Sequence, residues 1–158
     1  MRRVKFKAYP SFFILVAIFA VWGLYQWFED PFQMNSSEEG YLYTQNNIVM
    51  FIQWADTNNQ LTGQVQETYL DNTNTLHHDS HPFTGSHGKN NLSLMLSKNI
   101  SNGWSGETWT GNLNGKELEL VIPANGQLST VPFTLGTLSD YNQKVSELQQ
   151  QAQQASTQ

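Results

Sequence analysis

The chain has 158 residues, no cysteine and a formal net charge of −5 at pH 7. The lack of cysteine excludes disulfides, thiol catalysis and cysteine metal sites. Four of the eight basic residues lie within residues 1–7, so the rest of the chain carries four basic residues against thirteen acids, a net charge of −9. Because such a surface repels phosphate backbones, we expect no binding to nucleic acid.

The N-terminal segment is predicted to span a membrane. Residues 8–28 contain no charged side chain and are rich in large apolar residues. A helix of that length crosses the roughly 30 Å hydrocarbon core of a bilayer. The basic residues in 1–7 and the acids from Glu29 onward place the N-terminus in the cytoplasm and the remainder outside. Bulky residues at 21–28 argue against signal-peptide cleavage, so we expect an uncleaved single-pass anchor in the cell membrane, in contact with lipid.

The part outside the membrane is predicted to be a short tether followed by one domain. Residues 29–40 have no apolar period and are predicted to be the tether. Residues 41–138 form short alternating runs separated by Asn and Gly, which is typical of antiparallel β structure. About 100 residues are enough for one hydrophobic core. A cysteine-free extracytoplasmic domain of this size favours a bacterial protein.

Several strands can be placed from this alternation. Ile48 to Trp54 is apolar at both alternating sets of positions, and a turn over 56–59 precedes a second strand from Gln60 to Glu67. The last strand is predicted over residues 127–135. It contains Pro132, which cannot donate to a strand ladder and therefore predicts a sheet edge or a bulge.

An internal repeat lies between these strands. Residues 83–94 align with 109–120 when one gap is allowed on each side. Each copy has an aromatic residue followed by Thr-Gly, a turn with Gly-Lys, and a strand with Leu at every second position. Each copy is therefore predicted to be a hairpin, and Asn114-Gly115 is the preferred dipeptide for a two-residue turn with positive φ.

About seven or eight strands joined by short turns predict a small antiparallel β-barrel, with a β-sandwich as the alternative. Sequential hairpins favour the barrel because they close without a long crossover. Ser139 is predicted to cap a C-terminal amphipathic helix within 139–158, in which Tyr141, Val145 and Leu148 form one apolar stripe. That stripe is expected to pack on the sheet or to cover a barrel end.

The four histidines are the first candidate site: His77, His78, His81 and His87 lie within eleven residues, with Asp79 among them. Neutral imidazole is a good ligand for zinc or copper, and Asp79 is a possible further ligand. The alternative is a polar loop without a cofactor, which is indicated by Pro82 and the Asn- and Thr-rich flank. A pH-sensing loop is a third interpretation.

Aromatic side chains are the second candidate. A flat ring on a β face can stack on a sugar ring, and Trp104, Trp54 and Tyr69 are the residues proposed for this role. Trp104 lies in a segment rich in turn residues and is the one most expected to be exposed. Phe83 and Trp109 occupy the same place in the repeat, which predicts a structural role for both.

Catalysis is not expected. Asp79, Ser80 and His81 contain the letters of a catalytic triad, but neighbouring residues on a strand or loop point apart. Facing carboxylates could come from Glu67, Asp71, Glu107, Glu117 and Glu119, as in any acidic β domain. No other pattern of an enzyme site was recognised in the sequence.

The expected function is therefore non-catalytic binding of a ligand or protein partner outside the membrane. An aromatic-lined site for a glycan or an apolar ligand is the first interpretation. The alternatives are metal binding through the histidine segment, and a structural role in a membrane assembly that uses an exposed apolar patch or a strand edge near Pro132.

Overall fold

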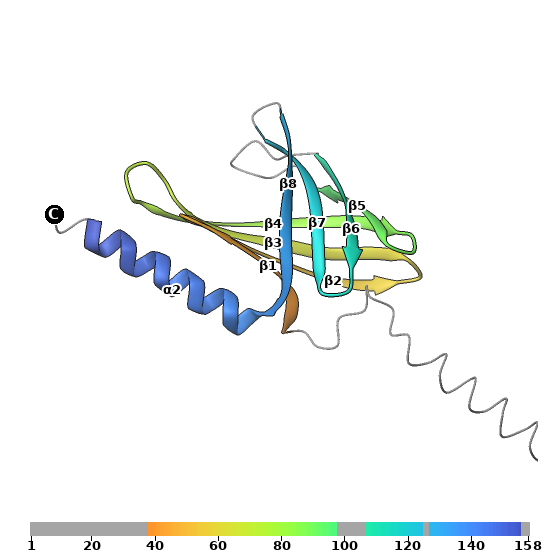
Figure 1. Cartoon of the computed structure of the whole chain (residues 1–158), viewed down its shortest axis with the longest axis horizontal. Helices are drawn as coiled ribbons and strands as arrows, with labels where there is room; N and C mark the ends of the chain where they lie inside the picture. Colours follow the sequence, from red (N-terminus) through yellow and green to blue (C-terminus); the bar gives the residue numbers. More distant parts are fainter. Residues whose placement is uncertain (1–37, 98–106, 125–126, 156–158) are drawn as a thin grey trace, which may run out of the picture. The chain divides into compact units, whose positions relative to one another are not determined.

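The computed structural model of the chain describes residues 38–97, 107–124 and 127–155 (Figure 1). Eight antiparallel strands form a closed barrel in which each strand pairs with the next, and the last strand returns to the first. The strands are β1 (Glu39–Gln45), β2 (Ile48–Thr57), β3 (Gln60–Leu70), β4 (Leu76–His87), β5 (Asn91–Leu96), β6 (Thr108–Asn114), β7 (Glu117–Ala124) and β8 (Gln127–Thr137), and the helix α2 (Leu138–Ala155) follows. The predicted barrel is confirmed, and the sandwich alternative is wrong.

The predicted transmembrane helix at residues 8–28 lies outside the described residues, as does the predicted tether up to residue 37. Within the described ranges, no helix combines the length and the apolar character that a membrane span needs. The anchor therefore stays a prediction.

The barrel interior is filled by apolar side chains from all eight strands. They are Tyr41, Met50, Ile52, Trp54, Leu61, Val65, Phe83, Leu92, Leu94, Leu96, Trp109, Leu113, Leu118, Leu120, Ile122 and Phe133. An eight-stranded barrel is just wide enough for such side chains to meet at its centre. Phe83 and Trp109 are each 1% exposed, which confirms their predicted structural role.

A second core lies between the outside of the barrel and α2. Val49, Phe51 and Leu70 pack against Tyr141 and Leu148 of the helix. Figure 1 shows the helix running along the outside of the strands. β2 is apolar on both faces, as predicted, because it separates the two cores, and the predicted helical stripe packs on the sheet.

The Thr-Gly pairs of the repeat, and a further Thr-Gly pair at residues 62 and 63, have a packing reason. Gly63 lies opposite Phe83 in the β3–β4 register. A Cβ atom on Gly63 would lie 2.0 Å from the Gln53 carbonyl oxygen and 2.8 Å from Phe83 Cζ. On Gly111 it would lie 2.1 Å from the Glu119 carbonyl oxygen. No larger side chain fits where the backbones approach this closely.

The β6–β7 turn consists of Gly115 and Lys116, with Gly115 at φ 63°. This is the predicted Gly-Lys turn, and Asn114 is the last residue of β6. This register pairs Leu113 with Leu118, and both are buried; a slip of one residue would turn one of them to solvent.

The helix begins two residues earlier than predicted because Thr137, not Ser139, is the capping residue. The amide of Asp140 donates to Thr137 Oγ1 over 3.1 Å, and the amide of Thr137 donates to Asp140 Oδ2 over 2.8 Å. This reciprocal pair is a capping box. The helix also continues through most of the Gln-rich end, to Ala155.

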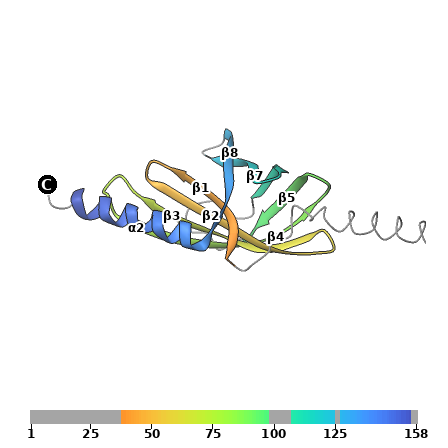
Figure 2. The same ribbon diagram turned by 60° about the horizontal axis from the view of Figure 1, so that its bottom comes forward.

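The barrel is closed by short ladders and opens at one end. β1 and β8 pair only between Glu39–Leu42 and Thr134–Thr137, and β5 pairs only with the second half of β4. Beyond these pairs the β3–β4 and β7–β8 hairpins point in different directions (Figures 1 and 2). We call this region, with residues 66–82 on one side and residues 121–124 and 127–131 on the other, the open end. Pro132 adjoins it and pairs with β7 but not with β1, so its missing N–H donor leaves no gap in the β1–β8 ladder. The strand itself pairs on both sides and is not the predicted edge strand.

Candidate functional site

The histidine segment is a strand rather than the predicted loop, because it forms most of β4 (Leu76–His87). Pro82 is accommodated there, and its carbonyl oxygen accepts a hydrogen bond from the Ser97 amide over 2.9 Å. Polar residues occupy both faces of the strand between 77 and 82, so the alternation that marks a strand is hidden in the sequence.

The strand separates the predicted metal ligands. His77, Asp79, His81 and His87 share the inward face with buried Phe83, whereas His78 lies on the outward face. At about 3.3 Å per residue, His77 and His87 are roughly 33 Å apart along the strand. Among residues 38–97, 107–124 and 127–155, no three or more His, Asp or Glu side chains are grouped to hold a metal ion.

His87 belongs to a buried ion pair at the end of the barrel opposite the open end. Its Nε2 lies 2.9 Å from Asp56 Oδ2, and its Nδ1 lies 2.8 Å from the Gly88 carbonyl oxygen. Both nitrogens face acceptors, so the geometry suits a ring with a proton on each nitrogen. The two side chains are 4% and 5% exposed, and they hold the β2–β3 hairpin against β4.

His78 helps to dock the helix. Its Nδ1 lies 2.8 Å from Thr68 Oγ1, which also shares a hydrogen bond of 2.7 Å with the Tyr141 hydroxyl. Thr68 is fully buried beneath α2. This histidine therefore completes a hydrogen-bonded chain between the outside of the sheet and the helix.

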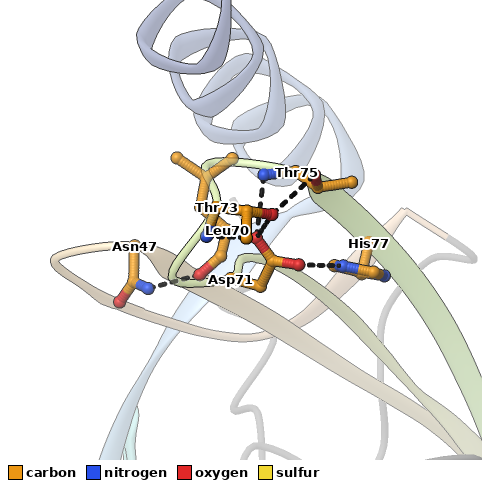
Figure 3. Close-up of polar contacts among 6 residues, drawn as sticks. All are labelled: Asn47, Leu70, Asp71, Thr73, Thr75 and His77. Atoms are coloured by element: carbon orange, nitrogen blue, oxygen red, sulfur yellow. Dashed lines mark hydrogen bonds and ion pairs between the residues drawn. The ribbon is translucent and has the colours of Figure 1, made fainter. Parts of the chain in front are cut away.

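His77 is oriented by Asp71 in the β3–β4 turn (Figure 3). Oδ1 of Asp71 accepts hydrogen bonds from the amide and the hydroxyl of Thr73 and from the amide of Thr75. Oδ2 lies 2.9 Å from His77 Nε2. The Thr73 hydroxyl first, and then His77, hold the pKa of Asp71 well below its usual range. Since a carboxylate only accepts, the proton of neutral His77 lies on Nε2.

The open end carries a pair of stacked rings on its inner face. Tyr69 and His77 are opposite each other in the register, with ring centroids 5.0 Å apart and an interplanar angle of 17°. Both side chains are partly exposed. We call Tyr69 and His77 the ring pair. Of the two predicted ligand-stacking residues that the structure describes, Trp54 and Tyr69, only Tyr69 has a partly exposed side chain.

The other two predicted stacking residues do not extend this surface. Trp54 is 6% exposed and stacks on Tyr41 in the barrel core, with ring centroids 5.2 Å apart, so its prediction as a ligand platform is wrong. Trp104 lies outside the described residues.

Next to the ring pair lies a cluster of Glu67, Asp79 and His81, which we call the acid–histidine cluster. Glu67 and His81 are 4% and 3% exposed, and Glu67 Oε2 lies 3.6 Å from His81 Nε2. Asp79 is partly exposed and lies opposite Glu67 in the register. Within the described part of the chain, neither ring nitrogen of His81 has a hydrogen-bond partner.

Burial decides the protonation of this cluster. It raises the pKa of Glu67 to about 7, and the charge of Asp79 acts in the same direction. Burial also lowers the pKa of His81, against the opposing effect of Asp79. Near neutral pH, His81 is therefore an uncharged ring with one donor and one acceptor nitrogen, and Glu67 is poised between its two forms.

Sequence reasoning missed Glu67 as part of a site, although a signal was present. Leu61 and Val65 are buried on the inward face of β3, and Glu67 is the next residue inward in the same alternation. The strand was expected to end there, whereas it continues to Leu70. An acid on the inward face of a barrel strand is unusual enough to indicate a functional role.

No protein-family model, curated protein or solved structure matches the chain.

Proposed function

We propose that the chain is a membrane-anchored, non-catalytic binding module that takes a carbohydrate ligand at the inner face of the open end. The observation that carries this proposal is the position of the ring pair beside the acid–histidine cluster on one face of β3 and β4. The predicted anchor at residues 8–28 would hold the barrel at the outer side of the cell membrane.

The two groups together suit a sugar. A pyranose ring presents apolar C–H groups on its faces and hydroxyl groups around its edge. The accessible ring of Tyr69 offers a flat surface for the face, and Asp79 offers acceptors for the hydroxyl groups. An apolar ligand fits this site less well than a sugar, because the barrel interior is filled with side chains and the inner face of the open end is polar.

The environment of Glu67 supports a binding role rather than a catalytic one. An acid that protonates a leaving group must reach the bond that breaks. The Glu67 carboxyl group is almost fully buried and faces His81, so it lies behind the accessible surface rather than on it.

The proposal is tested by isothermal titration calorimetry on the full chain in lipid nanodiscs, because sugar-headed detergents would compete for the site. A panel of glucose-based and N-acetylglucosamine-based oligosaccharides supplies the ligands. We expect at least one to bind, and we expect Tyr69→Ala to weaken its binding about tenfold through the loss of the stacking ring.

Tyr69→Phe keeps the ring and is expected to keep most of the affinity. Met95→Ala changes a side chain that is 59% exposed on β5, outside the open end, and is the control for a distant substitution. A panel without any binding, or equal affinities for the wild type and Tyr69→Ala, would contradict the proposed carbohydrate site.

A further inference from the structure

We infer that the Nδ1 atom of His77 accepts a hydrogen bond from a hydroxyl group of the carbohydrate ligand, and that Asp71 is the positioning residue that keeps this nitrogen free of a proton. The inference rests on the proposed carbohydrate site. It names the atom that recognises a ligand hydroxyl group, and it makes the position of the ring proton of one histidine a condition for binding.

The first observation is the fixed position of the Asp71 side chain in the β3–β4 turn (Figure 3). Its Oδ1 atom accepts hydrogen bonds from the Thr73 amide over 2.8 Å, from the Thr73 hydroxyl over 2.6 Å and from the Thr75 amide over 2.9 Å. These donors leave Oδ2 for His77 Nε2, at 2.9 Å. The Thr73 hydroxyl first, and then His77, hold the pKa of Asp71 well below its usual range, so this side chain is a carboxylate near neutral pH.

The carboxylate decides which nitrogen of His77 can accept. Because a carboxylate has no proton to donate, the single proton of the neutral ring lies on Nε2, and Nδ1 carries a lone pair. The His77 side chain is 41% exposed, and within the described part of the chain it contacts Asp71 through Nε2 and Tyr69 through its ring face. Nδ1 is therefore an accessible acceptor without a hydrogen-bond partner among the described residues.

The second observation, which does not depend on Asp71, is the stacking of His77 on Tyr69. The two ring centroids are 5.0 Å apart and the rings are nearly parallel, at 17°. Contact on one face and a hydrogen bond at one edge leave the imidazole ring little freedom to turn. A preorganised acceptor beside a flat aromatic surface suits a sugar, which presents hydroxyl groups at its edge and C–H groups on its faces.

The ring pair also sets a minimum length for the ligand. The lone pair of Nδ1 lies in the plane of the His77 ring, whereas a sugar stacked on the outer face of Tyr69 lies on the far side of Tyr69 from that plane. With 5.0 Å between the two ring centroids, and about 4.5 Å or more between stacked rings in general, the two contacts are separated by roughly 9 Å. One sugar ring cannot make both contacts, so the ligand contains at least two sugar units.

Asp71→Asn tests the role of Asp71 without removing its hydrogen bond to His77. The three donors around Oδ1 require the carbonyl oxygen of the new amide, so the NH₂ group takes the place of Oδ2. The NH₂ group donates to Nε2, and the ring proton is then on Nδ1. This variant converts the acceptor that faces the ligand into a donor, while the stack on Tyr69 is kept.

The first measurement is the ¹⁵N NMR spectrum of the full chain in nanodiscs, labelled at histidine and recorded without ligand. A pH of about 8 is used because imidazole side chains are ordinarily neutral there. We expect the His77 proton on Nε2 in the wild type and on Nδ1 in Asp71→Asn, and the loss of signals in His77→Phe assigns them. Asp140→Asn is the matched control, because Asp140 also accepts from the amide and hydroxyl of a threonine, Thr137, and has no histidine among its hydrogen-bond partners.

The second measurement is calorimetry with an oligosaccharide that binds in the panel and with analogues in which fluorine replaces one hydroxyl group at a time. Fluorine removes the donor, so we expect at least one analogue to bind the wild type about tenfold more weakly than the parent compound. His77→Phe keeps a flat ring but has no acceptor, and is expected to bind this analogue and the parent equally within about twofold. Asp71→Asn is expected to weaken the parent about tenfold, and Asp140→Asn to leave its affinity unchanged.

The outcomes separate the two proposals. A wild-type His77 ring protonated at Nδ1, or an Asp71→Asn ring that keeps its proton on Nε2, would overturn the inference. Equal affinities of the wild type, Asp71→Asn and His77→Phe for the parent, with Tyr69→Ala still weakened, would also overturn it and leave the carbohydrate site in place. A loss in Asp140→Asn as large as that in Asp71→Asn would reduce the effect to net charge and overturn the inference as well. Binding of no oligosaccharide to the folded wild type would overturn both proposals.

Discussion

Glu67 Oε2 and His81 Nε2 lie 3.6 Å apart on the inner face of two paired strands, and both side chains are almost fully buried. Burial shifts the pKa values of an acid and of a base in opposite directions. Burial favours the uncharged form of each, so it raises the pKa of Glu67 and lowers that of His81.

The first prediction concerns Glu67 and pH. The pKa of this carboxyl group rises on folding from 4.5 to about 7, so its contribution to stability is present below pH 4.5 and is lost as pH rises through 7. Glu67→Gln removes this dependence. We expect the free energy of unfolding of Glu67→Gln, relative to the wild type, to increase by roughly 3 kcal/mol between pH 4.5 and 8.

Urea unfolding curves at both pH values measure this difference, and Glu119→Gln, on the exposed face of β7, is the control. If the difference in unfolding free energy between Glu67→Gln and the wild type is the same at the two pH values, the pKa of the Glu67 carboxyl group is not raised by folding.

The second prediction concerns the ion pair between Asp56 and His87. His87→Ala leaves the Asp56 carboxylate buried without its charged partner and is expected to cost about 3 kcal/mol of unfolding free energy. The double variant Asp56→Ala/His87→Ala is expected to cost less than the sum of the two single variants by about 1 kcal/mol or more. A double-mutant cycle from urea unfolding measures this coupling, and additive values would show that the pair is not energetically linked.

The third prediction concerns Gly63. A Cβ atom there meets backbone and a ring at 2.0 and 2.8 Å, so Gly63→Ala is expected to destabilise the barrel by about 2 kcal/mol or more. Gly88→Ala is the matched control, because its Cβ meets only the movable side chain of Asn91 at 2.4 Å. Thermal unfolding followed by circular dichroism compares the two. Equal losses of stability in the two variants would show that the close approach of the backbones at Gly63 does not explain the Thr-Gly pairs.

The fourth prediction concerns the helix. Leu148 is buried between α2 and the sheet, and Leu148→Ala is expected to cost about 2–5 kcal/mol. Gln149→Ala lies next to it on the exposed side and is expected to change stability by no more than about 0.5 kcal/mol. Urea unfolding measures both. A small effect of Leu148→Ala would show that the barrel is stable without the docked helix.

The barrel was predictable because most of its inward positions are apolar and recur at every second residue, as Leu92, Leu94 and Leu96 do. The apolar stripe of α2 was predictable because its residues recur with the helical period of 3.6. In β4 both faces are polar near the histidines, so the same argument indicated a loop. The cap at Thr137 was missed because Ser139, two residues later, fits the same preference.

The candidate site could be predicted only in part. Tyr69 and the histidines were recognised by their chemistry, and the alternation of β3 already placed Glu67 inward. The pairing of Glu67 with His81, and of Asp56 with His87, depends on the register between distant segments, which no local pattern specifies. The open end depends on where the β1–β8 and β4–β5 ladders stop, and that also follows from tertiary pairing.

The central claim is that a ligand binds at the inner face of the open end, and the four histidines report on it directly. Two of them, His77 and His81, lie at the open end, His87 lies at the other end, and His78 lies on the outer face near α2. The measurement is the NMR spectrum of the full chain in nanodiscs, isotopically labelled at histidine, during titration with an oligosaccharide that binds in the calorimetry panel. We predict that the signals of His77 and His81 shift while those of His87 and His78 stay in place. Shifts confined to His87 or His78, or no shift at saturating ligand, would contradict the claim.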